Sequence, residues 1–204
     1  MAGNDLVHVV DDDVDVRKSL GFLLATANFA VRLHDSATAF LATATGNLDG
    51  CVVTDVRMPG IDGIEFLRQL RTRGHRLPVI VMTGHADVAL AVQAMKEGAA
   101  DFIEKPFDDE VLIDAIRSAL DNHNQADATH PLSAEIRGRL STLSERERQV
   151  LEGLVSGLPN KTIAYDLGIS PRTVEIHRAN VMSKMDASSL SHLVRMALIV
   201  ESKS

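Results

Sequence analysis

Short apolar runs alternate with longer stretches of helical periodicity through the first 121 residues. Strict alternation of strands and helices buries a parallel sheet between two layers of helices, so the pattern predicts a doubly wound α/β fold with a five-stranded parallel sheet. The expected strands lie near residues 6–10, 29–33, 51–55, 78–82 and 101–104. The expected helices lie near residues 14–27, 36–44, 63–73, 87–97 and 108–121.

Polar side chains stand where several of these strands end. The set consists of Asp11, Asp12, Asp55, Thr83 and Lys105. Because ligands of an open parallel sheet bind outside the carboxyl ends of its strands, these groups are expected in one crevice. Carboxylates there can bind Mg²⁺, and one of them can attack phosphorus as a nucleophile. The ammonium and the hydroxyl can then meet phosphoryl oxygens.

The alternation stops near Leu120, and the rest of the chain shows only helical periodicity. A polar stretch that ends at Pro131 is typical of a linker or a frayed helix end. The sequence therefore predicts a domain over residues 1–121, a linker over 122–132 and an all-α domain over 133–204. The helices expected in the second domain lie near residues 133–140, 144–156, 160–167, 171–185 and 188–201.

The composition is that of a globular protein, with 45% hydrophobic and 24% charged residues. No apolar run approaches the roughly 20 residues that a membrane-spanning helix needs, and the first residues lack the pattern of a secretory signal peptide. The lone Cys51 cannot form an internal disulfide, which favours a reducing compartment. We therefore expect a cytoplasmic protein with no membrane partner. The net charge of −7 comes from the first domain, whereas residues 128–204 are slightly basic.

Some polar residues are expected to be structural. His8 lies inside an apolar run, where a hydrogen-bonded core histidine is the common outcome, whereas His34 is expected at the surface. Asp13 is expected to begin a helix, where negative charge is favourable. Ser144 and Glu147 have the spacing of a capping box at the start of a helix.

Residues 160–180 read as two helices joined by a short turn that contains Gly168. This is the pattern of a helix-turn-helix, whose second helix can place polar side chains in the major groove. The candidate DNA contacts are Asn160, Lys161, Arg172, Thr173, Glu175, His177, Arg178 and Lys184. Glu175 can accept a hydrogen bond from cytosine, or it can pair with Arg172 or Arg178. From spacing alone, a helical hairpin with a solvated face remains an alternative.

The motifs of the first 121 residues resemble the receiver domain of bacterial two-component response regulators. They are Val9–Asp12, Thr54–Gly60, Val81–Gly84 and Gly98–Ala99 through Lys105–Phe107. The resemblance implies a CheY-like fold in which Asp55 accepts phosphate from a sensor histidine kinase. It implies that Mg²⁺ is bound by Asp12, Asp55 and the main-chain carbonyl of Arg57, with Asp11 acting through water. It also implies a paired switch of Thr83 and Phe102, and a cis Lys105–Pro106 bond.

Residues 140–200 are similar to the LuxR/NarL-type DNA-binding domain. The similarity lies in the run Leu143–Leu151, Gly157, Asn160–Lys161, Ile163–Ala164 and Thr173–His177. It implies a four-helix unit whose third helix, near residues 171–185, enters the major groove. It also implies that the last helix, near residues 188–201, can dimerise.

Together the two halves resemble the NarL/FixJ family of response regulators, and the motif Thr83–Asp87 adds to this likeness. The resemblance implies a transcription activator that dimerises on phosphorylation, binds double-stranded promoter DNA and acts on RNA polymerase. It implies an oxygen-sensing haem kinase as partner, and target genes for nitrogen fixation or microaerobic respiration. No enzymatic role beyond slow self-dephosphorylation is expected.

Two other classes remain as alternatives. A phosphohydrolase of the haloacid dehalogenase type also uses an aspartate nucleophile, but it carries a second acid two residues later, where this chain has Arg57. A flavodoxin-like cofactor binder would need a phosphate-binding loop after the first strand. The acidic turn at residues 11–13 contains no glycine, which argues against that class.

Overall fold

The computed structural model describes residues 5–46, 48–84, 88–124 and 130–201. The chain forms two compact units, which are Met1–Ala86 with Glu97–Ala126, and Asp87–Lys96 with Asp127–Ser204. Helix α5 continues to Asn124 and helix α6 begins at His130, so helical residues occupy both ends of the expected linker. The middle of that linker lies outside the described residues, as do residues 85–87.

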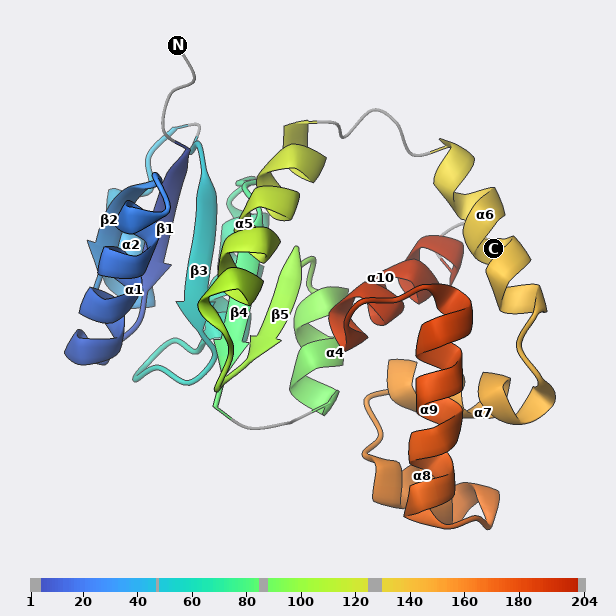
Figure 1. Cartoon of the computed structure of the whole chain (residues 1–204). Helices are drawn as coiled ribbons and strands as arrows, with labels where there is room; N and C mark the ends of the chain where they lie inside the picture. Colours follow the sequence, from blue (N-terminus) through green and yellow to red (C-terminus); the bar gives the residue numbers. More distant parts are fainter. Residues whose placement is uncertain (1–4, 47, 85–87, 125–129, 202–204) are drawn as a thin grey trace. The chain divides into compact units, whose positions relative to one another are not determined.

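The first unit contains a parallel sheet of five strands in the order β2-β1-β3-β4-β5 (Figure 1). The strands are β1 (Leu6–Val10), β2 (Ala30–His34), β3 (Cys51–Asp55), β4 (Val79–Thr83) and β5 (Asp101–Glu104). Val10 is in register with Thr54, Asp55 with Met82, and Thr83 with Glu104. The carboxyl ends of the four strands β1, β3, β4 and β5 therefore meet at one edge. This confirms the expected fold class.

Helices cover both faces of the sheet. Helices α1 (Val14–Thr26) and α5 (Asp109–Asn124) bury leucine and isoleucine side chains against Val7, Val9 and Val53 on one face. Side chains alternate along a strand, so His8 points to the opposite face. There it meets Phe40 of α2 (Ala37–Thr43), which packs on Phe66 of α3 (Gly63–Thr72). Helix α4 (Val88–Lys96) follows β4 along the chain and groups with the second unit.

Two histidines join β1 to β2 within this aromatic cluster. His8 is 4% exposed, and its Nδ1 lies 3.1 Å from Nε2 of His34. His34 is half-buried and contacts Phe40 as well, so the expectation that it lies at the surface was wrong. Burial, together with the nearby His34 and Arg32, lowers the pKa of His8 to about 4. His8 is therefore neutral at pH 7, as a buried core histidine requires.

The helices of the second unit share a core of aliphatic side chains. They are α6 (His130–Ser141), α7 (Glu145–Val155), α8 (Asn160–Leu167), α9 (Pro171–Met185) and α10 (Leu190–Glu201). Val150 and Leu154 of α7, Val174 and Val181 of α9, and Leu193 of α10 are all fully buried. No helix in the described ranges is long and apolar enough to cross a membrane.

Local signals set the helix boundaries of this unit. The expected capping box at Ser144 is present, and Ser170 caps α9 directly before Pro171. Gly168 ends α8 with a φ of 64°, a left-handed conformation that glycine adopts without steric cost. Helix α10 begins at Leu190 rather than near residue 188, because the hydroxyl of Ser189 accepts the backbone N–H of His192.

Candidate functional site

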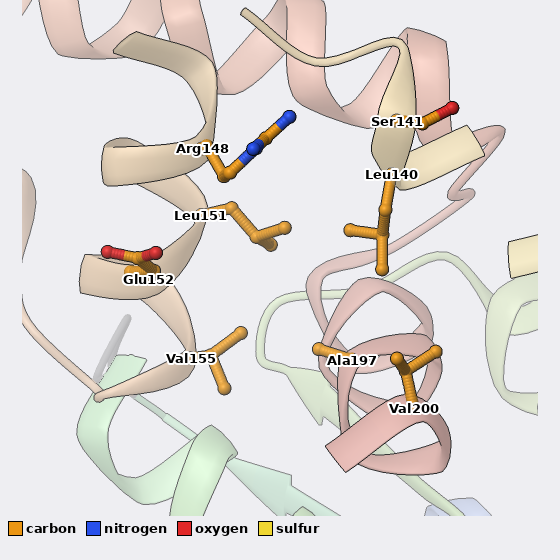
Figure 2. A pocket seen from close by; sticks show the side chains of 8 residues that line it. All are labelled: Leu140, Ser141, Arg148, Leu151, Glu152, Val155, Ala197 and Val200. Atoms are coloured by element: carbon orange, nitrogen blue, oxygen red, sulfur yellow. The ribbon is translucent and has the colours of Figure 1, made fainter. Parts of the chain in front are cut away.

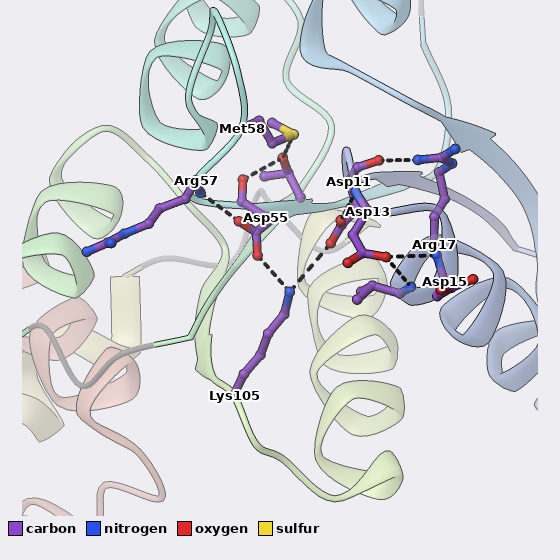
Figure 3. A network of polar contacts seen from close by, with 10 residues as sticks. Asp11, Asp13, Asp15, Arg17, Asp55, Arg57, Met58 and Lys105 are labelled. Carbon is purple, nitrogen blue, oxygen red and sulfur yellow. Dashed lines mark hydrogen bonds and ion pairs between the residues drawn. The ribbon is translucent and has the colours of Figure 1, made fainter.

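The ammonium of Lys105 lies between two carboxylates at the carboxyl edge of the sheet (Figure 3). Its Nζ is 2.6 Å from Oδ1 of Asp55 and 3.4 Å from Oδ2 of Asp11. Asp11 is 2% exposed, and burial is the main cause that raises the pKa of its carboxyl. The structure thus brings together three of the five groups that the strand ends predict. The Lys105–Pro106 bond is cis, as the resemblance implied.

The turn after β1 is held by its own polar groups. The backbone N–H of Asp13 donates to Oδ1 of Asp11 at 2.9 Å. Asp13 in turn accepts the backbone N–H groups of Asp15 and Val16, so it begins α1 as expected. Asp12 lies in the same turn and is exposed to solvent. Apart from Asp13, which caps α1, the turn therefore presents one buried and one exposed carboxylate.

The loop after β3 orients the Asp55 carboxylate. Its Oδ2 accepts the backbone N–H of Arg57 at 2.6 Å, while the Arg57 side chain extends away from Asp55 (Figure 3). A Cβ at Gly63 would lie 2.3 Å from the Asp55 carbonyl oxygen, so only glycine lets α3 begin this close to the strand end. Arg57 occupies the position at which a phosphohydrolase carries its second acid, and its guanidinium points away from Asp55.

Thr83 and Phe102 lie on neighbouring strands. Thr83 is fully buried, and within the described residues its hydroxyl has no hydrogen-bond partner. A buried polar group without a partner costs about 1–3 kcal/mol, so such groups usually have a functional reason. Phe102 is half-buried, and its strand neighbour is Val81. The unpaired hydroxyl is the kind of group that a phosphoryl oxygen would satisfy.

The donor set fits Mg²⁺ in its chemistry. Asp11, Asp12 and Asp55 offer only oxygen ligands, which this hard cation prefers, and it usually takes one or two carboxylates together with waters and phosphate. In the part of the chain that the structure describes, no three His, Cys, Asp or Glu side chains converge as a metal site. The positive charge between the carboxylates of Asp11 and Asp55 is supplied by the Lys105 ammonium.

The expected DNA contacts lie on α9 and at the start of α8, and they differ in exposure. Arg172 and Glu175 are exposed, and Lys161 is exposed at the start of α8. His177, Arg178 and Asn160 are half-buried. The Thr173 hydroxyl lies 2.8 Å from that of Ser170, so it forms part of the helix cap.

Ile176 is an exposed residue of α9 that the sequence reasoning missed. It is 56% exposed and lines a shallow groove with Arg172, Glu175 and Ala179. An exposed β-branched residue between polar neighbours can contact the methyl group of thymine in the major groove. Helical periodicity could have identified it, because Ile176 lies away from the side of α9 that buries Val174 and Val181.

Lys184, one of the expected DNA contacts, has an intramolecular partner in the structure. Its Nζ lies 2.6 Å from Oε2 of Glu147 and 3.4 Å from the Thr142 carbonyl oxygen. Glu147 is 4% exposed and also accepts the backbone N–H of Ser144. The hydrogen bond from Lys184 is the main cause that lowers the pKa of Glu147 to about 2. We therefore assign Lys184 to joining α9 to the start of α7.

The ion pair with Glu147 predicts that Lys184→Ala affects stability more than DNA binding. We expect a lower melting temperature but an unchanged salt dependence of DNA binding, because the ammonium already has protein partners. Lys161→Ala, which removes an exposed cation at the start of α8, should instead reduce the slope of log K against log salt by about one unit. Binding isotherms at several salt concentrations measure both slopes. A reduced slope for Lys184→Ala would return that residue to the DNA interface.

A separate apolar pocket of about 430 Å³ lies between α6, α7 and α10 (Figure 2). Its wall is formed by Leu140, Ser141, Arg148, Leu151, Glu152, Val155, Ala197 and Val200. The charged side chains of Arg148 and Glu152 are exposed, while Leu151 and Val155 are buried at its base. The pocket involves none of the α9 residues, so it is distinct from the candidate nucleic-acid interface.

Both halves of the chain match known protein families. Residues 7–117 match the response regulator receiver domain. Residues 141–197 match the bacterial regulatory proteins of the luxR family. The two matches correspond to the sheet with its acidic edge and to helices α7–α10.

Proteins that combine both parts are similar to this chain over nearly its whole length. The transcriptional regulatory protein FixJ of Azorhizobium caulinodans is 60% identical over 95% of this chain and 92% of its own length. FixJ of Rhizobium meliloti is 60% identical over 94% of each. The crystal structure of full-length FixJ from B. japonicum matches with a TM-score of 0.58 and 51% identity, over 97% of this chain and 98% of that one. The chain belongs to the two-component response regulators that join a receiver domain to a LuxR-type DNA-binding domain.

Proposed function

We propose that this response regulator controls transcription through a phosphoryl group on Asp55. The observation that carries the proposal is the arrangement at the carboxyl edge of the sheet. There the Asp55 carboxylate lies against the Lys105 ammonium, beside the buried Asp11. The buried Thr83 hydroxyl, which has no partner among the described residues, is available for a new acceptor. A phosphoryl group on Asp55 would pair with Lys105 and Thr83, while Asp11 would help to hold Mg²⁺.

The proposed chemistry is transfer from a phosphohistidine of a sensor kinase. A carboxylate oxygen of Asp55 attacks phosphorus, a P–O bond forms, and the P–N bond to the imidazole breaks. The Lys105 ammonium pairs with a phosphoryl oxygen, and the Thr83 hydroxyl donates to another. Mg²⁺, held by Asp11, Asp12, Asp55 and the Arg57 carbonyl, would neutralise negative charge when bound. Arg57 stands at the position where a phosphohydrolase carries its second acid, so we propose slow self-dephosphorylation.

The phosphoryl group would then alter the surface near β5. We propose that Thr83 moves toward a phosphoryl oxygen on Asp55 and that this movement frees volume beside β5. Phe102 carries no hydroxyl, so its inward or outward position would be set by packing alone. We propose that the remodelled surface of β5 and α5 forms the homodimer. Decisive switching needs several kcal/mol of difference between the two states.

In the DNA-binding half, we propose that α9 enters the major groove. Arg172 and Arg178 would contact phosphates or guanine bases of the DNA. Asn160 and Lys161 would contact phosphates of the DNA backbone. Glu175 and His177 lie on the same helix as candidate base contacts.

The name of the FixJ relatives supports a transcriptional regulator, here proposed as an activator that acts with RNA polymerase in the bacterial cytoplasm. By the same likeness we propose nitrogen-fixation or microaerobic genes as targets and an oxygen-sensing haem kinase as partner.

The direct test is phosphorylation of the full-length protein by a small-molecule phosphodonor with Mg²⁺. Intact-mass spectrometry should show the addition of a single phosphoryl group, and peptide mapping should locate it at Asp55. An unmodified protein, or modification only elsewhere, would contradict the proposed phosphoacceptor. Rapid multiple turnover of phosphomonoesters would instead favour the phosphohydrolase.

Ile176 should read thymine through its methyl group. We expect Ile176→Ala to weaken binding to a cognate promoter by several-fold, since a buried methyl group contributes about 0.8 kcal/mol. Replacing the contacted thymine by deoxyuridine should weaken wild-type binding similarly and leave Ile176→Ala unaffected. Other thymines of the site provide the internal control. Equal sensitivity of both proteins to deoxyuridine at every position would remove Ile176 from base recognition.

A further inference from the structure

Arg17 reaches back from α1 to the turn that carries the acidic residues. Its Nη1 donates to the main-chain carbonyl of Asp11 at 2.6 Å (Figure 3). Arg17 lies one turn into the helix that Asp13 begins. The side chain is half-buried and points at the backbone of the turn. The contact is therefore between a charged donor and the peptide that links Asp11 to Asp12.

This contact fixes an orientation. A peptide unit is planar, so holding the Asp11 carbonyl also sets the direction in which the chain leaves toward Asp12. The Asp11 side chain is held independently by the backbone N–H of Asp13. Charge-assisted hydrogen bonds are shorter and about twice as strong as neutral ones. The two contacts together hold the Asp11 carboxylate and the peptide from which the chain continues to Asp12.

We propose that Arg17 is a positioning residue for the magnesium site, acting through the Asp11 carbonyl. It is not a ligand, and it does not touch the phosphoryl group. The inference rests on the proposed function, since it concerns the cation that Asp11, Asp12 and Asp55 would hold. Residues that orient metal ligands typically change metal affinity by about 10–100-fold when they are replaced.

Charge alone predicts the opposite result. A guanidinium beside a cation site repels the cation, so removing it should strengthen Mg²⁺ binding if electrostatics dominates. Positioning predicts weaker binding after the same substitution. Lys18 offers a matched control, because it is the next residue of α1, carries the same charge and is exposed. The sign of the change therefore distinguishes the two effects.

The experiment is a calorimetric titration of the full-length, unphosphorylated protein with MgCl₂. Arg17→Ala should raise the Kd at least about tenfold, Arg17→Lys should recover part of the loss, and Lys18→Ala should leave the Kd unchanged or slightly lower. The amide of Asp13 should also lose hydrogen-exchange protection in Arg17→Ala and keep it in Lys18→Ala. Melting curves establish that each variant is folded.

A Kd for Arg17→Ala equal to or below that of the wild type would overturn the inference and leave the metal site itself intact. Absence of Mg²⁺ binding by the wild type would overturn the proposed metal site, and the inference with it. Should Arg17→Ala fail to fold, Arg17→Gln keeps a neutral donor at this position. Its Kd should then lie above that of the wild type, and an unchanged value would contradict the proposal.

Discussion

Asp55→Asn should abolish the increase in promoter binding that a phosphodonor produces in the wild type. The amide of asparagine is neutral and cannot attack phosphorus. It also loses the ion pair with Lys105, whose Nζ lies 2.6 Å from Oδ1 of Asp55. A two-state switch that moves from 1:99 to 99:1 requires about a 10⁴-fold preference, so even partial switching should give the wild type an increase of roughly tenfold or more.

Gel mobility on promoter DNA at one fixed salt concentration measures this effect for both proteins, with and without phosphodonor. Asp35→Asn is the matched control, because Asp35 is an exposed carboxylate on the loop after β2. This control should respond to phosphodonor as the wild type does. A phosphodonor response that survives in Asp55→Asn would mean that another group accepts the phosphate or that phosphate does not control DNA binding.

Acidification below pH 6.5 should destabilise the receiver unit through its buried histidine, His8. The pKa of His8 falls from 6.5 to about 4 on folding, because the ring is buried beside His34 and Arg32. Between these values the unfolded state binds more protons than the folded state, so stability is present above pH 6.5 and is lost as the pH falls toward 4. The full loss amounts to about 3 kcal/mol at 1.36 kcal/mol per pKa unit.

Differential scanning calorimetry of the full-length chain at several pH values follows the transition of the receiver unit. His8→Phe should flatten its dependence on pH, since phenylalanine can fill the aromatic cluster with Phe40 without a proton to bind. His123→Ala, at an exposed position in the last turn of α5, should leave the dependence unchanged. A His8→Phe variant that still loses the same stability would place the proton uptake elsewhere.

Features set by near neighbours in the chain could be predicted from the sequence. The strands, the cap at Asp13 and the capping box at Ser144 depend on patterns that span a few residues. The meeting of Asp11, Asp55 and Lys105 was also predictable, because strand alternation places the ends of parallel strands at one edge. The resemblance to receiver domains then supplied roles that spacing alone leaves open.

Features set by pairing between distant elements could not be predicted in this way. Lys184 lies 37 residues from Glu147, and its charge alone suggested a DNA contact. His34 is the last residue of the short edge strand β2, and only the register of β1 with β2 brings it against His8. Both cases concern polar side chains whose protein partner is distant in the sequence.

Because the chain has almost no tryptophan or tyrosine, its two halves differ in ultraviolet fluorescence. The chain has no tryptophan, and its single tyrosine, Tyr165, is on α8 with 87% of its surface exposed. Tyrosine emission therefore comes only from the DNA-binding half. A change in tyrosine emission when Asp55 is phosphorylated would report communication between the halves without any added label. A tryptophan introduced in the receiver would give that half its own signal.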